Sequence, residues 1–213
     1  MNKKGLFIVL EGGEGVGKTT NSLFIQHYLK EQGIDFSNSR EPGGTALAEK
    51  IRSLILEKHE ERVADMTELL LVFAARAQHL QEKILPVMAS GQWMLCDRFT
   101  DATYAYQGGG REMDKTIITQ LEQLVQAELR PDLTIILDAP VEVGHARAQA
   151  RAALDRMESE ANSFHQRVRA AYIERAQANP HHYAVIDASQ ALTDVQTDLK
   201  TVLDAQIQQW RQA

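Results

Sequence analysis

The sequence predicts an α/β fold in which a parallel sheet of five strands is covered by helices on both faces. Short apolar runs alternate with longer helix-like segments along almost the whole chain, which is typical of parallel sheets buried on both sides. The first apolar run leads into a glycine-rich loop and then a helix. The chain has 213 residues and no internal repeat, low-complexity tract or Pro/Ser linker. We therefore expect one domain over residues 1–213.

The elements of the first half follow from apolar periodicity and from glycine positions. Residues 6–10, Leu-Phe-Ile-Val-Leu, form the first strand, and residues 19–31 form a helix. Gly33 is expected to end that helix, because glycine readily adopts the left-handed conformation that commonly follows a helix. A second strand over 34–39 precedes a helix over 45–57. A long helix over 65–89 follows, apolar on one side.

The second half continues the alternation. Gly91 ends the long helix, and residues 93–96 form the third strand. A helix over 114–128 precedes Pro131, and Leu-Thr-Ile-Ile-Leu at 133–137 is the fourth buried strand. Helices are expected at 141–153 and 159–178, a fifth strand at 183–186 and a last helix at 193–210. The stretch 104–111, Tyr-Ala-Tyr-Gln-Gly-Gly-Gly-Arg, is expected to be a loop with a glycine hinge; its rings and amide suit a sugar and a planar base.

Composition limits the class of protein. The net charge is −6 and the pI is about 5.7, which argues against a nucleic-acid-binding surface. The apolar stretches fall short of the roughly 18 residues that a membrane span needs. A single cysteine, Cys96, excludes an internal disulfide and suits a reducing compartment, so we expect a cytoplasmic protein. Histidine and cysteine show no metal-ligand spacing.

Residues 12–19, Gly-Gly-Glu-Gly-Val-Gly-Lys-Thr, fit the phosphate-loop pattern G-x-x-x-x-G-K-[ST] at every fixed position. Such a loop turns backbone N–H groups toward a polyphosphate at the start of a helix. Lys18 is expected to reach the β- and γ-phosphates, and the Thr19 hydroxyl to ligate Mg²⁺. The predicted binding residues for a nucleoside triphosphate are Gly12, Gly13, Glu14, Gly15, Val16, Gly17, Lys18 and Thr19.

Polar residues follow the second and third strands, whose carboxyl ends should meet the phosphate loop at one edge of the sheet. Asp97 directly follows a buried strand and is a candidate Mg²⁺ ligand, with an ordinary strand-end aspartate as the alternative. Arg98 is a candidate clamp on a second phosphate. The segment Arg40-Glu41-Pro42-Gly43-Gly44-Thr45 is either part of this site or a turn capped by Thr45.

Three arginines gather after the fourth strand. Arg147 and Arg151 lie four residues apart and share a helix face, and Arg156 follows. Such a row is most often a solvated surface. Because it follows a strand end, we interpret residues 147–158 as a lid that closes over the triphosphate and excludes water.

Five segments, in this order, resemble those of bacterial thymidylate kinases, and the resemblance covers residues 5–210. They are Glu-Gly-x-Glu-Gly-x-Gly-Lys-Thr-Thr, Arg-Glu-Pro-Gly-Gly-Thr, Asp-Arg-Phe, Ala-Tyr-Gln-Gly-Gly-Gly-Arg and Leu-Asp-Arg-Met-Glu. The resemblance implies a P-loop nucleoside monophosphate kinase fold and the reaction ATP + dTMP → ADP + dTDP, with Mg²⁺ and without a general base. It also implies a homodimer.

The resemblance assigns roles to particular residues. Glu14 would address the deoxyribose 3′-hydroxyl, Phe73 would stack on thymine and Arg76 would bind the base edge; by sequence alone these last two read as a core and a surface residue. Asp155 and Glu158 would support the acceptor side. The residues implied for dTMP are Glu14, Arg40, Pro42, Phe73, Arg76, Arg98, Thr103, Tyr106 and Gln107. Those implied for catalysis are Lys18, Arg98, Arg147, Arg151 and Arg156, with Thr19 and Asp97 for Mg²⁺.

Three positions depart from the family's common pattern: Phe99, Ala102 and Gln149 stand where Tyr or His, Ser, and a third lid arginine are frequent. Two alternatives remain. A kinase for another monophosphate would differ only in the base pocket. Thymine and uracil, for example, differ by one methyl group, which is worth about 1–3 kcal/mol in discrimination. A nucleotide-dependent switch would need an Asn-Lys-x-Asp guanine reader if it used GTP, and the sequence contains none.

Overall fold

A computed structural model of the chain describes residues 4–150 and 155–212. Five parallel strands form one sheet, as the sequence predicts, and their order is β2-β3-β1-β4-β5. The strands are β1 (Phe7–Gly12), β2 (Phe36–Arg40), β3 (Trp93–Asp97), β4 (Leu133–Asp138) and β5 (Tyr183–Asp187). Because β1 lies between β3 and β4, the loops that leave the carboxyl ends of these three strands adjoin one another.

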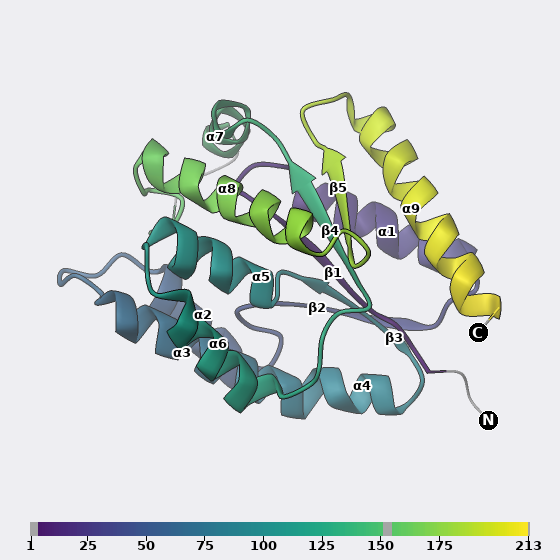
Figure 1. The fold of residues 1–213 in the computed structure, drawn as a ribbon, viewed down its shortest axis with the longest axis horizontal. Coiled ribbons are helices and arrows are strands. Elements are labelled where there is room, and N and C mark those ends of the chain that lie inside the picture. Colours follow the sequence, from purple (N-terminus) through teal and green to yellow (C-terminus); the bar gives the residue numbers. More distant parts are fainter. Residues whose placement is uncertain (1–3, 151–154, 213) are drawn as a thin grey trace.

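Helices cover both faces of the sheet (Figure 1). They are α1 (Lys18–Glu31), α2 (Ala46–Leu56), α3 (Asp65–His79), α4 (Leu85–Ala89), α5 (Thr100–Thr103), α6 (Lys115–Gln126), α7 (Val141–Gln149), α8 (Asn162–Ala178) and α9 (Leu192–Gln212). Alternate strand residues pack against different helices. Ile8 and Leu10 of β1 share a cluster with residues of α1 and α9, while Phe7 and Val9 pack with Leu80 and other residues on the opposite face.

The long helix expected over 65–89 forms, but with a wider turn in its middle. Residues Leu80–Ile84 (η1) are π-helical, and the Leu85 N–H donates to the Leu80 carbonyl five residues earlier. Pro86 follows at the start of α4. Proline has no N–H and its ring clashes with the carbonyl four residues before it. A widened turn removes this conflict, so the helix continues past the proline.

The glycine-rich stretch is a buried helix, which corrects the expectation of a loop with a hinge. Helix α5 continues into the π-helical segment η2 (Tyr104–Gly110). A Cβ on Gly109 would lie 2.8 Å from that of Ala171, and one on Gly110 would lie 2.4 Å from the Phe164 ring. The glycines therefore allow η2 to pack closely on α8. Their low helix propensity concealed this helix in the sequence.

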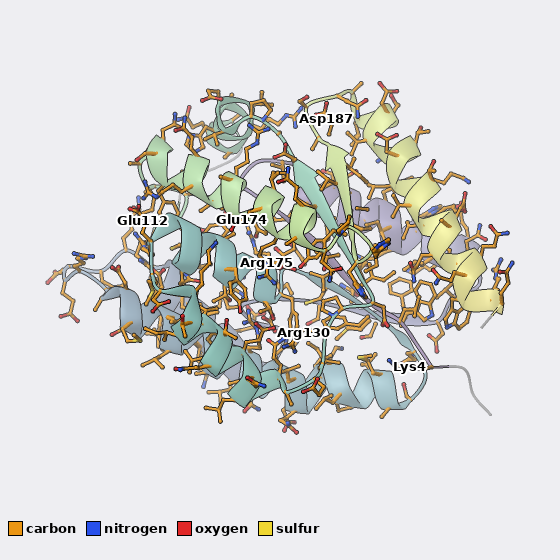
Figure 2. The ribbon with its side chains drawn as sticks, in the orientation of Figure 1. Lys4, Glu112, Arg130, Glu174, Arg175 and Asp187 are labelled. Carbon is orange, nitrogen blue, oxygen red and sulfur yellow. The ribbon has the colours of Figure 1, made fainter. Side chains whose placement is uncertain are left out.

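Charged side chains tie α8 to the elements beneath it. Arg175 points from α8 toward α5 (Figure 2), where its guanidinium pairs with Asp101 and lies 3.9 Å from the ring centroid of Tyr104. Arg167 of α8 donates to the carbonyls of Gly109 and Gly110. These contacts hold η2, which lines the site described below. Within the described residues, no helix is long and apolar enough to cross a membrane.

Candidate active site

The phosphate loop connects β1 to α1 and is built on glycines with positive φ. Gly12, Gly15 and Gly17 have φ of 138°, 66° and 89°, which favour glycine. A Cβ on Gly15 would lie 1.9 Å from the Gly144 carbonyl oxygen of α7, so the loop rests on that helix. The Lys18 ammonium donates to the Gly12 and Gly13 carbonyls at 3.1 and 2.6 Å. Burial and then Arg98 lower the pKa of Lys18 to about 8.

The turn after β3 directs two adjacent side chains into the same cleft. Arg98 adopts a positive φ of 68° at a bend immediately after Asp97. Asp97 Oδ1 is buried and has no hydrogen-bond partner in the described part of the chain. Because an uncompensated buried oxygen is costly, this atom is suited to a cation or to a donor that enters the cleft.

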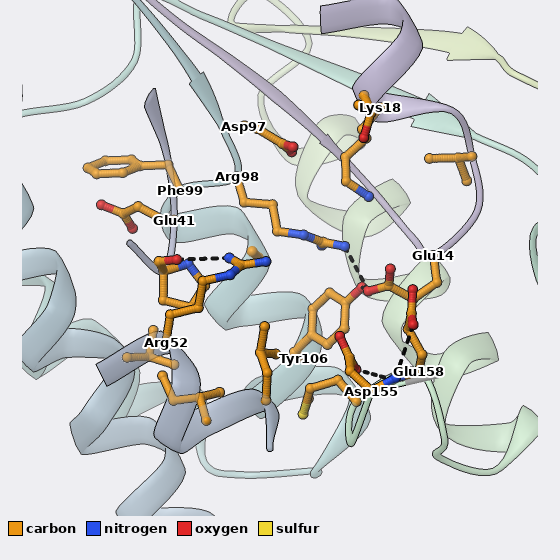
Figure 3. Close-up of a pocket in the computed structure, with 18 of the residues that line it drawn as sticks. Glu14, Lys18, Glu41, Arg52, Asp97, Arg98, Phe99, Tyr106, Asp155 and Glu158 are labelled. Atoms are coloured by element: carbon orange, nitrogen blue, oxygen red, sulfur yellow. Dashed lines mark hydrogen bonds and ion pairs between the residues drawn. The ribbon is translucent and has the colours of Figure 1, made fainter. Parts of the chain in front are cut away.

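The predicted residues from three strand ends meet in a cleft of about 700 Å³. Figure 3 shows Lys18 and Asp97 on one side and Asp155 and Glu158 on the other, with Arg98 and Tyr106 between them. The predicted residues that line it are Glu14, Gly15, Val16, Gly17, Lys18, Thr19, Pro42, Arg76, Asp97, Arg98, Thr103, Tyr106, Gln107, Arg147, Asp155 and Glu158. Gly12 and Gly13 line a smaller cavity behind the phosphate loop.

Glu14 is the acidic centre of this cleft. Its Oε1 accepts from Arg98 Nη2 at 2.8 Å and from the Tyr106 hydroxyl at 2.5 Å. Burial favours the neutral acid, but the positive charges of Arg98 and Lys18 outweigh it and lower the pKa of Glu14 to about 2. The carboxylate is therefore ionised at neutral pH and fixes both partners. The Arg98 guanidinium also lies 4.8 Å from the centroid of the Tyr106 ring.

Arg76 lies on the wall of the cleft, but Phe73 does not, contrary to the expectation of a stacking ring. Phe73 is 3% exposed and packs with Leu69, Tyr104 and other apolar residues. Its ring centroid lies 4.9 Å from the Arg76 guanidinium carbon. Val72, one residue earlier, lines the cleft instead. Each residue of an α-helix is rotated about 100° from the last, so neighbours face different surroundings.

Arg40 does not line the cleft, contrary to the prediction, whereas Arg52 does. The Arg40 side chain is 54% exposed and pairs with Glu49 at 2.8 Å. Arg52 of α2 donates to the Pro42 carbonyl at 2.8 Å and lines the cleft. Burial lowers the pKa of Arg52, and the charges of Arg40 and Arg98 lower it further. An anion near Arg52 and Arg98 would relieve this excess of positive charge.

The lid residues are divided between the cleft and its rim. Arg147 lines the cleft and donates to the Ala188 carbonyl at 2.8 Å. Asp155 and Glu158 bond each other's backbone N–H groups at 2.8 and 3.2 Å. Arg156 is directed away from the cleft, to Glu68 at 2.7 Å and the Ile55 carbonyl at 2.8 Å. Arg151, also predicted to act here, lies outside the described residues.

Glu11 supports the site from within strand β1. The sequence did not indicate this role, because the residue is part of an apolar strand. It is 0% exposed. Its Oε1 accepts from the N–H groups of Phe99 and Ala102 at 2.7 and 3.2 Å, and its Oε2 from the Tyr172 hydroxyl at 2.8 Å. Burial and then the nearby Asp101 raise the pKa of Glu11 to about 8. Glu11 thus holds the turn that carries Arg98.

A P-loop fold whose cleft joins a triphosphate loop to a second group of cations defines a nucleotide-dependent phosphotransferase. No group of three or more His, Cys, Asp or Glu side chains in the described ranges is arranged to hold a metal ion. Residues 10–199 match the family model described as thymidylate kinase. The chain belongs to the thymidylate kinase family and is a kinase.

Individual relatives agree with this membership. The thymidylate kinase of Ectopseudomonas mendocina is 58% identical over 207 residues, which cover 97% of this chain and 99% of the relative. That of Alcanivorax borkumensis is 53% identical over 206 residues, with the same coverage. The crystal structure of thymidylate kinase from Ehrlichia chaffeensis superposes with a TM-score of 0.75 at 32% identity, over 94% of this chain and 99% of that one. This neighbour also has the P-loop nucleoside monophosphate kinase fold predicted here.

Proposed function

We propose that the chain transfers the γ-phosphoryl group of ATP to dTMP, giving ADP and dTDP for dTTP synthesis, through the cleft described above. The observation that supports this assignment is that a phosphate loop and further basic side chains line one cleft, where we assign two anion-binding regions. The phosphate loop with Lys18 forms one, and Arg52 with Arg98 forms the other. A nucleotide switch needs only the first, whereas transfer between two phosphorylated nucleotides needs both.

The donor nucleotide is assigned to the phosphate loop. Its backbone N–H groups at the start of α1 would bind the triphosphate, and Lys18 would exchange its bonds to the Gly12 and Gly13 carbonyls for phosphate oxygens. Mg²⁺ fits the cleft, because the unpartnered Asp97 Oδ1 and the Thr19 hydroxyl supply the oxygen ligands it prefers. When bound, the ion would neutralise charge on the transferring phosphoryl group.

The acceptor nucleotide is assigned to the wall formed by β3, α3 and η2. Arg52 and Arg98 would hold its phosphate, while Tyr106, fixed by Glu14, would contact the sugar. Arg76 would read the base edge beside Thr103 and Gln107. Arg52 replaces Arg40 in this proposal, and Val72 replaces Phe73 as the side chain that faces the base.

Catalysis by this site needs no general base. The acceptor phosphate is already an anion, so the rate depends on positioning and on charge neutralisation. Lys18, Arg98 and Arg147 line the cleft and would act on the transferring group. We assign residues 147–158 to a lid, with Arg156 as an anchor to α3 through Glu68. Arg151 is retained in the lid from the sequence resemblance.

The proposal is tested by ADP release with Mg-ATP and a panel of dTMP, dUMP, UMP, CMP, AMP and GMP. Strong turnover with dTMP, weak turnover with dUMP and almost none with UMP is the expected result. Preferential turnover of another monophosphate would retain the kinase but reject the base assignment. Absence of acceptor-dependent ADP release from folded, ATP-binding protein would favour the switch.

We also propose that the protein is a cytoplasmic homodimer. Helices α2 and α3 pack on each other, and each exposes large apolar side chains. Leu47 and Leu54 of α2 are 52% and 49% exposed, and Met66 and Leu70 of α3 are 41% and 50% exposed. A second copy of the chain would cover this α2/α3 surface, defined by these four residues. ATP and dTMP are metabolites of the cytoplasm, which supports the location.

A further inference from the structure

A continuous chain of hydrogen bonds runs from the cleft wall to strand β2. Arg76 Nε donates to Glu41 Oε2 at 2.7 Å. Glu41 Oε1 accepts from His79 Nδ1 at 3.0 Å, and His79 Nε2 lies 2.6 Å from Ser39 Oγ. Arg76, Glu41 and His79 are 1%, 3% and 0% exposed. Because a carboxylate only accepts, Nδ1 carries the hydrogen, and Nε2 of the neutral imidazole accepts a hydrogen bond that the Ser39 hydroxyl donates.

This chain leaves one end of the Arg76 guanidinium available. Nη2 donates to the Phe99 carbonyl and to Thr103 Oγ1 at 3.0 and 2.9 Å. The rings of Phe73 and Phe99 lie 4.9 and 5.1 Å from the guanidinium carbon. Nη1 is buried and has no hydrogen-bond partner among the described residues. Three hydrogen bonds and two aromatic rings thus fix the Arg76 guanidinium, and Nη1 is left for a group that enters the cleft.

The Ser39–His79–Glu41 order resembles a hydrolytic triad, but access excludes that activity. A Cβ on Gly44 would lie 2.4 Å from Ser39 Oγ and 2.5 Å from His79 Nε2. The backbone of Gly44 therefore covers the hydroxyl, and no room remains for an acyl group to approach it. Within this hydrogen-bond chain, Arg76 alone is both held in place by the other members and left with an unused donor. We therefore place the function of the hydrogen-bond chain at Arg76.

We propose that Ser39 and His79 are positioning residues that set the selectivity for a pyrimidine carbonyl over an amino group at ring position 4. They act through Glu41 on Arg76, and the inference rests on the proposed assignment of Arg76 to the base edge. A guanidinium only donates. Thymine presents an acceptor oxygen at position 4, whereas cytosine presents an amino donor. A rigid Nη1 donates to the carbonyl oxygen of thymine but meets the amino group of cytosine as a second donor, whereas a mobile arginine would avoid that conflict.

The test compares kcat/KM for dTMP with kcat/KM for dCMP in positioning variants. His79→Leu removes both bonds of the imidazole, Ser39→Ala removes only the last one, and His79→Asn keeps a donor near the position of Nδ1. His27→Leu is the matched control, because His27 lies on α1 with a side chain 75% exposed.

The expected result for His79→Leu is a fall of about tenfold in the dTMP/dCMP ratio, equivalent to about 1.4 kcal/mol, from a higher KM for dTMP and a nearly unchanged kcat. The ratio should fall less in Ser39→Ala, and it should stay near the parent value in His79→Asn and His27→Leu. An equal loss for both substrates in His79→Leu would overturn the inference, because it would show a purely structural role. If His79→Leu does not fold, an unchanged ratio in Ser39→Ala overturns it.

Arg76→Lys separates this inference from the assignment beneath it. An unchanged ratio in a folded Arg76→Lys enzyme would reject Arg76 as the reader of the base, and the positioning role with it. A reduced ratio in Arg76→Lys together with unchanged ratios in the Ser39 and His79 variants would retain Arg76 and reject the positioning role alone.

Discussion

The position proposed for Lys18 in catalysis carries a cost in stability. Its folded pKa of about 8 lies below the ordinary value of 10.5. The folded chain therefore disfavours the ammonium at every pH below about 8, and this cost fades as the pH rises from 8 to 10.5. At neutral pH the side chain is charged where burial opposes the charge.

Lys18→Met should lower kcat by roughly a hundredfold to a thousandfold, because one donor to the transition state is lost. Since the aliphatic stem remains and the buried charge is removed, the free energy of unfolding at pH 7 should not fall. It should rise by about 1 kcal/mol. Steady-state kinetics and urea denaturation measure the two quantities. A large loss of stability with normal kcat would reject the assigned role.

Glu11→Gln should change how stability depends on pH. The folded pKa of Glu11, about 8, lies above the ordinary value of 4.5. Between these values the unfolded chain loses the proton and the folded chain keeps it, so stability falls as the pH rises. The neutral amide removes this contribution, on the order of a few kcal/mol over that window. Urea denaturation from pH 4.5 to 8.5 should show a flatter profile than the parent; an identical profile would contradict the shift.

The sequence predicted the position of a residue correctly where that position depends on local chain geometry. The phosphate loop and the Asp97–Arg98 pair follow directly from strand ends, and both lie in the cleft. It did not predict the position where that depends on which way a helix faces. Phe73 and Val72 differ by one position; Phe73 packs with Tyr104 of η2 and Ile118 of α6, and Val72 meets the cleft. Arg52 likewise depends on the orientation of α2.

At the scale of elements, the close contact between η2 and α8 holds the acceptor wall in place. Gly110 faces the Phe164 ring, and Gly109 faces Ala171 and the Arg167 backbone. The sequence showed three glycines and suggested flexibility, because propensity alone gives no information about a tertiary partner. The structure instead shows glycines that let two helices approach.

Gly110→Ala should destabilise the fold by about 1–3 kcal/mol, since the added methyl group would overlap an aromatic ring in a packed interface. Gly108→Ala is the matched control, because its Cβ would lie 3.3 Å from the flexible end of Ile118. Thermal denaturation of both variants measures the difference. A Gly110→Ala protein as stable as the control would show that η2 and α8 do not pack this closely.

At the scale of the whole molecule, the chain gathers basic and acidic side chains in one cleft and leaves apolar side chains on another surface. The net charge of −6 favours solubility, whereas the α2/α3 surface favours association. The five-stranded parallel sheet and its helical layers followed from the alternation of apolar runs, whereas the order of the strands came from the structure. The association surface did not, because apolar periodicity does not distinguish a side chain covered by the same chain from one covered by a second copy.

Leu47→Asp combined with Leu54→Asp should reduce the mass in solution from two chains to one. The new carboxylates of the two copies would be buried against each other in the interface and would repel. Light scattering after size-exclusion chromatography measures the mass. Leu192→Asp is the control, since Leu192 is 49% exposed on α9, away from this surface. A parent protein that is a monomer, or a dimer unaffected by the double substitution, would reject the α2/α3 surface as the interface.

The position of Glu14 has a consequence for how the two substrates affect each other. This carboxylate belongs to the phosphate loop, yet it holds Arg98 and Tyr106 on the acceptor side. A triphosphate that shifts the loop therefore also shifts the groups assigned to the monophosphate. Equilibrium coupling of this kind is reciprocal: the factor by which ATP changes the affinity for dTMP equals the factor by which dTMP changes the affinity for ATP. Through the Glu14 side chain, the affinity for ATP and the affinity for dTMP are thus coupled.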